Sequence, residues 1–285
     1  MEKNLELLKN DAYLGAFIRK YQLSDDYILK HLSTFMDTYL SRKICEGCKG
    51  LSSCGQAAKG QYMDIYYDGL VMNDVVYCSH RLETIKKQKH RTSFLYNDIP
   101  DNLSDLYLKD ISYTEDQKEL YAYMLGILNQ KLDKGLYIYG NLGVGKTYLC
   151  IGLANSLVDR NYGVAFVKVS SFFNEMKAQI GNDSSMFDKT ISKLKKADYL
   201  FLDDIGAEAV SDFVRDDVLF AILDHRLENG LFTIFTSNLD KQDLLKHYTY
   251  DRKDKSNLMN AKRLLERIDI LSDDYCLDGD NKRRV

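Results

Sequence analysis

Length, composition and charge exclude several classes of protein. The 285 residues suffice for about two domains, taking ~150 residues as a soft unit, and 45% hydrophobic with 28% charged residues is ordinary for a soluble chain. A formal net charge of −3 provides no overall basic field for nucleic acid, so such binding would need a local patch. No apolar run approaches the ~18 residues of a membrane span, and residues 1–6 lack a signal-peptide core, so we expect a cytoplasmic protein that enters no membrane.

The segment ahead of the cysteines predicts helices. Residues 3–20 carry apolar side chains in a loosely helical pattern, and Ser24 precedes two acids as an N-cap would. The apolar residues that follow recur at helical spacing: Ile28, Leu32, Phe35, Met36 and Tyr39. Two packed helices of a small domain and a face that docks a partner both fit this pattern.

Cysteines cluster in the next segment, where four of the six lie between Cys45 and Cys78. In a reducing compartment this clustering favours a metal over disulfides. Cys45 and Cys48 form C-x-x-C, Cys54 follows closely, and with Cys78 they would complete a tetrahedral zinc site in which His80 is a possible substitute for one thiolate. Such a site would staple a domain with little core. Unpaired buried cysteines, or a redox pair at Cys45 and Cys48, are the alternatives.

Residues 61–77 predict short strands with turns at 68–69 and 73–74, so a β-meander would carry Cys78 back to the first cysteine pair. A basic run follows at residues 81–91, which fits either a solvated helix or a nucleic-acid contact. We divide the chain into an N-terminal domain (1–90), a linker (91–112) and a C-terminal domain (113–285).

Residues 140–147 fit the phosphate-binding pattern G-x-x-x-x-G-K-[ST]. The motif needs a strand before it and a helix after it, and residues 136–139 and 148–158 predict these elements. Glycines let backbone N–H groups converge on a polyanion, and the start of a helix adds partial positive charge. Lys146 is expected to reach the outer phosphates and Thr147 to bind Mg²⁺. The predicted nucleotide-binding residues of this segment are Gly140, Asn141, Leu142, Gly143, Val144, Gly145, Lys146, Thr147 and Tyr148.

Strands and helices alternate around this loop, which predicts an α/β fold with a central parallel sheet flanked by helices. Residues 114–117 match a capping box that opens a helix leading into the first strand. The later strands are expected at 164–169, 199–202 and 231–236. The helices between and after them are expected at 170–180, 185–196, 214–227 and 261–270. The tail at 278–284 is polar and basic, a composition that suits disorder.

Two of these strands deliver polar residues to the carboxyl edge of the sheet, where ligands bind in open α/β folds. Asp203 and Asp204 end the strand at 199–202. We expect Asp203 to hold Mg²⁺, directly or through water, and Asp204 to polarise the attacking water. Asn238 follows the next strand and either helps to orient that water or belongs to a helix cap.

Taken together, the motifs resemble those of bacterial primosomal helicase loaders of the DnaI type. The resemblance rests on residues 202–208, 214–218, 236–240 and 261–268, and on the cysteine-bearing N-terminal domain, which is similar to the zinc-binding domain of that family. It therefore covers both predicted domains. The ATPase motifs alone are shared with many AAA+ proteins, including the DnaC branch and transposition helpers of the IstB type. The N-terminal cysteines narrow the resemblance to DnaI-like loaders.

The resemblance implies roles for particular residues. Lys146 and Thr147 would lie in Walker A, Asp203 and Asp204 in Walker B, and Asn238 would be sensor 1. Arg267 sits where the family's arginine finger acts on a neighbouring subunit's ATP, and Arg283 is a candidate sensor 2. AAA+ proteins usually have Asp-Glu in Walker B. Because the second carboxylate is shorter here, we expect slow hydrolysis.

The implied mechanism is helicase loading with ATP, Mg²⁺ and Zn²⁺ as cofactors. The N-terminal domain would bind a replicative DnaB-type helicase, while several ATPase domains self-associate with ATP between them and hold single-stranded DNA. Candidate DNA contacts are Lys177 and the basic run near Lys86, with Phe172 and Phe173 either stacking on bases or belonging to the core. The alternatives are an IstB-like transposition helper and a zinc-stabilised adaptor that binds nucleotide with little hydrolysis.

Overall fold

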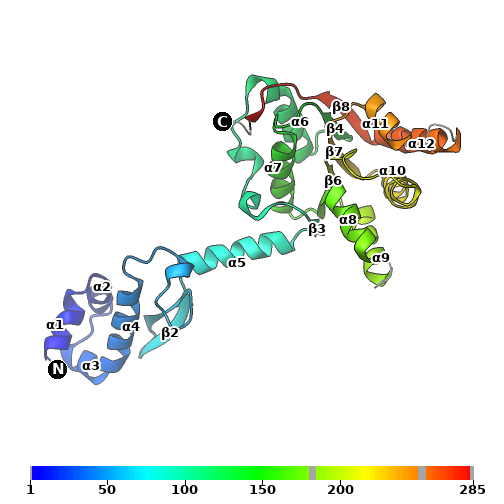
Figure 1. Ribbon diagram of the computed structural model, residues 1–285. Coiled ribbons are helices and arrows are strands. Elements are labelled where there is room, and N and C mark those ends of the chain that lie inside the picture. Colours follow the sequence, from blue (N-terminus) through cyan, green and yellow to red (C-terminus); the bar gives the residue numbers. More distant parts are fainter. Residues whose placement is uncertain (1, 180–183, 250–254, 283–285) are drawn as a thin grey trace. The chain divides into compact units, whose positions relative to one another are not determined.

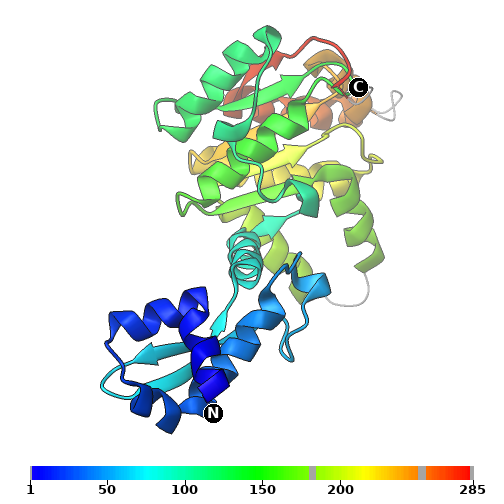
Figure 2. The ribbon, with the colours of Figure 1, turned by 90° about the vertical axis from the view of Figure 1, so that its left-hand side faces the viewer.

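The computed structural model describes residues 2–179, 184–249 and 255–282 of the chain (Figures 1 and 2). Contacts divide the chain into two compact units, Met1–Gln88 and Lys89–Val285, and helix α5 (Ser79–Thr92) crosses the boundary between them. Each unit has its own hydrophobic core. Among the described residues, no helix is both long enough and apolar enough to cross a membrane.

Unit 1 begins with four short helices where the sequence predicted two longer ones. The helices are α1 (Glu2–Asn10), α2 (Ala12–Lys20), α3 (Asp25–Lys30) and α4 (Leu32–Cys45), followed by the 3₁₀ turn η1 (Leu51–Ser53). Asp11 caps α2 and, as predicted, Ser24 caps α3, each accepting a backbone N–H. Leu8, Ile28 and Phe35 are fully buried in the common core, so the predicted apolar face is largely internal.

The predicted β-meander of unit 1 is a single hairpin. Strands β1 (Gln61–Tyr67) and β2 (Val71–Tyr77) pair antiparallel, with the chain reversal at the predicted Asp68-Gly69 turn. The second predicted turn was wrong, because Asn73 lies within β2 opposite Ile65. Its side chain accepts a hydrogen bond from Thr38 on α4 at 3.2 Å, so this polar residue is accommodated in the strand.

Unit 2 contains a parallel sheet of six strands in the order β3-β5-β6-β7-β4-β8. The strands are β3 (Tyr96–Asn97), β4 (Gly135–Tyr139), β5 (Val164–Lys168), β6 (Tyr199–Asp203), β7 (Phe232–Ser237) and β8 (Ser272–Cys276). The four strands expected from sequence, β4 to β7, are confirmed. Strands β3 and β8 at the two edges were not predicted.

Helices cover both faces of this sheet, as Figure 1 shows. Alternate residues of β6 enter different cores, Leu200 and Leu202 on one face and Tyr199 and Phe201 on the other, which explains the continuous apolar run. One face packs against α6 (Lys118–Leu128) and α7 (Lys146–Val158). The other packs against α8 (Val169–Gln179), α9 (Ser184–Lys196), α10 (Ala221–Glu228), α11 (Lys241–Tyr248) and α12 (Lys255–Leu271).

Residues 91–112, expected to form a linker, contribute structure to unit 2. They supply β3 and the 3₁₀ turns η2 (Asp101–Leu103) and η3 (Leu108–Asp110), and Ile99 and Leu108 are buried in its core. A further 3₁₀ turn, η4 (Glu115–Gln117), contains the predicted capping box: the Thr114 N–H donates to Gln117 Oε1 at 3.2 Å.

The helix predicted at 214–227 begins with a π-helical segment, η5 (Phe213–Phe220), before α10. Its Arg215 side chain is completely buried. The guanidinium donates to Asp212, Asp216, Asn257 and the carbonyl of Tyr248, at 2.6 to 3.0 Å. π-helical segments are rare and often occur at functional sites, and this one is fixed against α11 and α12 by the hydrogen bonds of Arg215.

A second buried arginine, Arg226 on α10, bonds to no carboxylate in the described part of unit 2 but to main-chain carbonyls. It donates to the carbonyls of Leu194 and Ala197, at 2.9 and 2.8 Å, and to Thr233 Oγ1 at 2.9 Å. Helix α9 ends at Lys196, so Arg226 satisfies carbonyls that the end of a helix leaves without intrahelical partners. Burial lowers the pKa of Arg226, and these hydrogen bonds offset the cost of removing its charge from water.

We predict that Arg226→Lys lowers the free energy of unfolding of unit 2 by about 2–3 kcal/mol, because an ammonium group cannot reach all of these acceptors. Urea unfolding followed by circular dichroism measures the change. The matched control is Arg263→Lys, since Arg263 is exposed on α12. Equal unfolding midpoints for both variants would contradict the assigned role.

Candidate functional site

The loop at residues 140–147 joins β4 to α7 at the carboxyl edge of the sheet, and β4 lies between β7 and β8. Three glycines give the loop its shape: φ is +145° at Gly140, +83° at Gly143 and +104° at Gly145. Other residues rarely adopt such values. Successive N–H groups in a loop of this kind form a concavity that binds anions, and the start of α7 reinforces it.

Lys146 lies inside this loop with 7% of its surface exposed. Its ammonium donates to the carbonyls of Gly140 and Asn141, both at 2.8 Å, and to Asn238 Oδ1 at 2.9 Å. The positive charge is therefore held between the loop and the end of β7. A phosphate group entering the loop would offer the ammonium charge-assisted hydrogen bonds, which are stronger than those to neutral carbonyls.

Asp203 stands at the end of β6 with 5% of its surface exposed. The hydroxyls of Thr147 and Thr236 both donate to its Oδ1, at 2.7 and 2.6 Å. Burial raises the pKa of the Asp203 carboxyl, and the two hydrogen bonds partly counteract that shift. A buried carboxylate beside a loop hydroxyl supplies hard oxygen ligands, which suits Mg²⁺ bound together with phosphate.

Asp204 has a left-handed backbone, with φ at +60°. Its N–H donates to Thr236 Oγ1 at 2.9 Å, and Asn238 Nδ2 donates to its carboxylate at 3.0 Å. Asp tolerates this conformation better than most residues, and such backbones concentrate at functional sites. The second carboxylate of the pair is thus bonded to Asn238, whose side-chain oxygen in turn accepts from Lys146.

The structure thus brings together five residues that the sequence singled out: Lys146, Thr147, Asp203, Asp204 and Asn238. Thr236 completes the cluster but had no assigned role, although its place at the end of a buried strand was a usable signal. The residues assigned to the loop differ in exposure. Val144 is buried, whereas 64% of Leu142 and 44% of Tyr148 are exposed.

A turn just after the carboxylate pair contains a further functional candidate that sequence reasoning missed. Glu208 is buried, and its carboxylate accepts the Gly206 N–H at 2.8 Å and the hydroxyl of Tyr248. Burial, together with Glu208, raises the pKa of Tyr248 well above its ordinary value. Since the carbonyl of Tyr248 accepts from Arg215, hydrogen bonds connect this turn to η5.

Arg267 lies on α12 and is held against α10. Its guanidinium donates to Asp224 at 3.0 Å and to the adjacent Glu266 at 2.8 Å, and it lies 5.0 Å from the centre of the Phe220 ring. These contacts place Arg267 apart from the cluster around Lys146. Arg283, the candidate sensor 2, lies outside the described residues.

The cysteines expected to bind zinc are half-buried and reduced, and they lie in unit 1. Among the residues that the structure describes, His, Cys, Asp and Glu side chains form no group of three or more that could hold a metal, so the expected zinc site is not shown. Two thiol sulfurs accept N–H hydrogen bonds: Cys45 from the Gln56 side chain at 3.2 Å and Cys54 from the Gly60 backbone at 3.4 Å. Backbone hydrogen bonds lower the pKa of Cys54, so this thiol is predisposed to form a thiolate.

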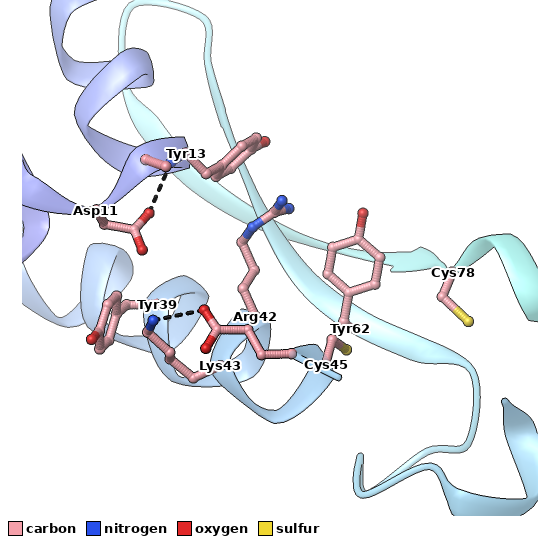
Figure 3. Close-up of a pocket in the computed structure, with 10 residues that line it drawn as sticks. Asp11, Tyr13, Tyr39, Arg42, Lys43, Cys45, Tyr62 and Cys78 are labelled. Atoms are coloured by element: carbon pink, nitrogen blue, oxygen red, sulfur yellow. Dashed lines mark hydrogen bonds and ion pairs between the residues drawn. The ribbon is translucent and has the colours of Figure 1, made fainter. Parts of the chain in front are cut away.

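Cys45 and Cys78 also line a pocket of about 330 Å³ in unit 1 (Figure 3). Arg42 crosses the pocket with its guanidinium 3.5 Å from the centre of the Tyr13 ring and 5.6 Å from that of Tyr62. Stacking of this kind holds an arginine side chain in one orientation.

The residues proposed to contact DNA divide into core and surface. Phe172 and Phe173 are 3% and 2% exposed, so they belong to the core of unit 2. Lys86 is exposed on α5. The side chain of Lys177 lies outside the described residues.

Comparison with protein-family models matches residues 107–273 to the IstB-like ATP-binding proteins. Across the whole chain, the replicative helicase loader DnaI of Bacillus subtilis is 28% identical over 293 residues, which covers 99% of this chain and 93% of that protein.

Two solved structures are similar to about two thirds of this chain. A crystal structure of DnaI is 32% identical and covers 66% of this chain and all of that chain, with a TM-score of 0.58. A proposed primosome component from Streptococcus pyogenes serotype M3 is 28% identical and covers 70% of this chain and all of that chain, with a TM-score of 0.56. The family match at residues 107–273 includes the loop and both carboxylates.

Proposed function

The chain belongs to the IstB-like ATP-binding family and is a member of the DnaI type, and from this we propose that it loads a replicative DnaB-type helicase onto single-stranded DNA. One observation carries the proposal: the likeness to a replicative helicase loader extends over 99% of the chain and so includes unit 1. The IstB-like match covers only residues 107–273, and a transposition helper would not account for unit 1.

In this proposal unit 1 binds the helicase and unit 2 binds ATP with Mg²⁺, so that ATP binding and hydrolysis switch the loader between assembly and release. Lys146 and the loop N–H groups hold the phosphates, and Thr147 and Asp203 hold Mg²⁺. Asp204, steadied by Asn238, polarises the attacking water.

Self-association of unit 2 would complete each site. The Arg267 side chain keeps 22% exposure despite its bonds to Asp224 and Glu266. A rotamer change would therefore turn its guanidinium toward ATP bound by a neighbouring subunit. A guanidinium supplied by a neighbour would stabilise charge on the transferred phosphoryl group. Arg283 would add a contact from the end of the chain.

The proposal includes a zinc ion in unit 1, for which the only argument is the set of donor side chains. The ligands would be Cys45, Cys48, Cys54 and Cys78, or three of these cysteines with His80. Four cysteines within one small unit, two of them already accepting N–H hydrogen bonds, match the chemistry of a structural zinc site. The metal would hold the loop after α4 against the end of the hairpin.

A second function is favoured by the carboxylate pair. Asp204 is one methylene shorter than the glutamate usual at this position, so a nucleotide-binding adaptor with little hydrolysis is the alternative. In that case assembly would depend on ATP binding, and the protein would return to its starting state by nucleotide exchange rather than by ATP hydrolysis.

The helicase-binding role predicts different behaviour for two forms of the protein. The full chain should co-elute with a DnaB-type helicase in size-exclusion chromatography and stimulate its unwinding of a forked duplex. Residues 89–285 should still bind a fluorescent ATP analogue, because unit 2 has its own core, yet fail to co-elute. Equal co-elution of both forms would move the helicase contact to unit 2.

Hydrolysis is tested with Asp204→Asn, since Asn also tolerates a positive φ and should preserve the fold. Loss of the base should reduce steady-state ATP turnover, measured with single-stranded DNA present, by about 10²-fold while ATP still binds. Asp217→Asn, an exposed carboxylate of η5, is the matched control and should turn over ATP normally. A wild-type rate no higher than that of Lys146→Ala would reject the enzyme and favour the adaptor.

Zinc is tested by metal analysis of the full chain purified under reducing conditions, with about one zinc ion per chain expected. The Cys48→Ser variant should bind much less zinc, and the wild type treated with a chelator should melt at a lower temperature than the untreated wild type. Cys276→Ser is the control, because Cys276 is exposed in unit 2 and far along the chain from the cluster. A metal-free wild type would remove zinc from the proposal.

A further inference from the structure

A segment close to the end of the chain, residues 277–282, packs against the phosphate-binding loop. We call residues 277–282 the C-terminal strap. It begins at Leu277, which is fully buried and whose N–H donates to the carbonyl of Tyr139 at 2.7 Å, extending the pairing of β8 with β4. At its other end, the Lys282 N–H donates to the carbonyl of Gly143 at 3.0 Å.

The strap lies close to two loop glycines. A Cβ added at Gly140 would lie 2.1 Å from the carbonyl oxygen of Leu277, and one added at Gly143 would lie 2.0 Å from Asn281 Oδ1. At Gly140 the obstacle is main chain, so a side chain there would force the backbone apart, whereas at Gly143 the side chain of Asn281 would have to move aside. The main chain of the loop therefore packs directly against the strap.

A second segment supports the loop at the next residue. The Gln117 side chain is 4% exposed, and its Nε2 donates to the carbonyl of Val144 at 2.9 Å. Lys282 Nζ also donates to Thr114 Oγ1 at 3.3 Å, so the strap and the capping box are bonded to each other. Two consecutive loop carbonyls are thus held, one by each segment.

Peptide planarity gives these contacts a consequence for the site. In a trans peptide the carbonyl of one residue and the N–H of the next point in opposite directions. Fixing the Gly143 carbonyl toward the strap directs the Val144 N–H away from it. Fixing the Val144 carbonyl toward Gln117 likewise directs the Gly145 N–H away from Gln117. These are the N–H groups that a polyphosphate meets in such a loop.

We propose that Gln117 and the strap, through the Lys282 N–H and Asn281, are positioning elements of the nucleotide site: they hold the loop so that the N–H groups of Val144 and Gly145 face the phosphates. This inference rests on the proposed ATP-binding role of the loop and deepens it. The ligand class is a nucleoside di- or triphosphate, whose β-phosphate fits these donors. Because linkage is reciprocal, bound nucleotide in turn holds the strap in place.

The test compares Lys282→Pro, which removes both the N–H and the ammonium, with Lys282→Ala, which removes only the ammonium. Loss of one net hydrogen bond predicts roughly a two- to tenfold weaker affinity for ATP and for ADP in the proline variant relative to the alanine variant. Gln117→Met, of similar volume, should weaken both nucleotides to a similar extent. Fluorescent-nucleotide titration measures affinity, and melting temperatures without nucleotide report on folding.

Steady-state kinetics separate positioning from general damage. Since the β-phosphate contacts are present before and during phosphoryl transfer, KM should rise while kcat stays constant. Equal nucleotide affinity of the proline and alanine variants would overturn the strap's role even though wild type binds ATP. Absence of ATP binding by wild type, with Lys146→Ala as reference, would overturn the proposed function and this inference with it.

If the proline variant fails to fold, a measurement on the wild-type chain still tests the proposal. Adding ADP with Mg²⁺ should slow amide hydrogen exchange in residues 277–282 by several-fold, because occupied loop N–H groups stabilise the carbonyl orientation that the strap binds. Exchange in this segment that is unchanged by ADP would overturn the proposal.

Discussion

The buried carboxylate of Asp203 is the contact around which the site is built. Hydroxyls from the start of α7 and from β7 both donate to it, so one oxygen joins β6, β7 and the phosphate-binding loop. A carboxylate removed from water is costly unless it is hydrogen-bonded or bound to a cation. In the sheet, β6 lies beside β7 and β7 lies beside β4. This order brings the two hydroxyls to the same carboxylate oxygen, and their hydrogen bonds offset the cost of burying it.

Polar groups continue inward from this edge as one hydrogen-bonded series. Glu208, just after the carboxylate pair, bonds to Tyr248 on α11, whose carbonyl accepts from Arg215 in η5, and Arg215 also donates to Asn257 on α12. Each of these groups is buried, and each has partners because burying an unsatisfied polar group is expensive. The π-helical backbone of η5 is the local distortion that accompanies the burial of Arg215.

The sequence predicted the part of the fold that depends on local pattern. Continuous apolar strands, the loop glycines and the acids at the end of β6 each have a signature within about ten residues, and together they located Lys146, Asp203 and Asn238 correctly at one edge. The edge strand β8 escaped prediction because Ser272, Asp273 and Asp274 have low strand propensity. Its place in the sheet comes from pairing with β4, a contact between segments far apart in sequence. The buried arginines escaped for the same reason, since their acceptors are distributed over several elements.

Gly143 shows how a motif can conceal a second constraint. The phosphate-binding pattern demands glycine at Gly140 and Gly145 but leaves the four positions between them open, so the motif does not explain the glycine at 143. Its φ of +83° does, because residues with a side chain rarely adopt this value, and a Cβ at 143 would also meet the side-chain amide of Asn281 in the strap. The polar tail, whose composition suited disorder, is thus matched to the loop by shape. A single glycine records a contact between residues 143 and 281 that no local pattern could reveal.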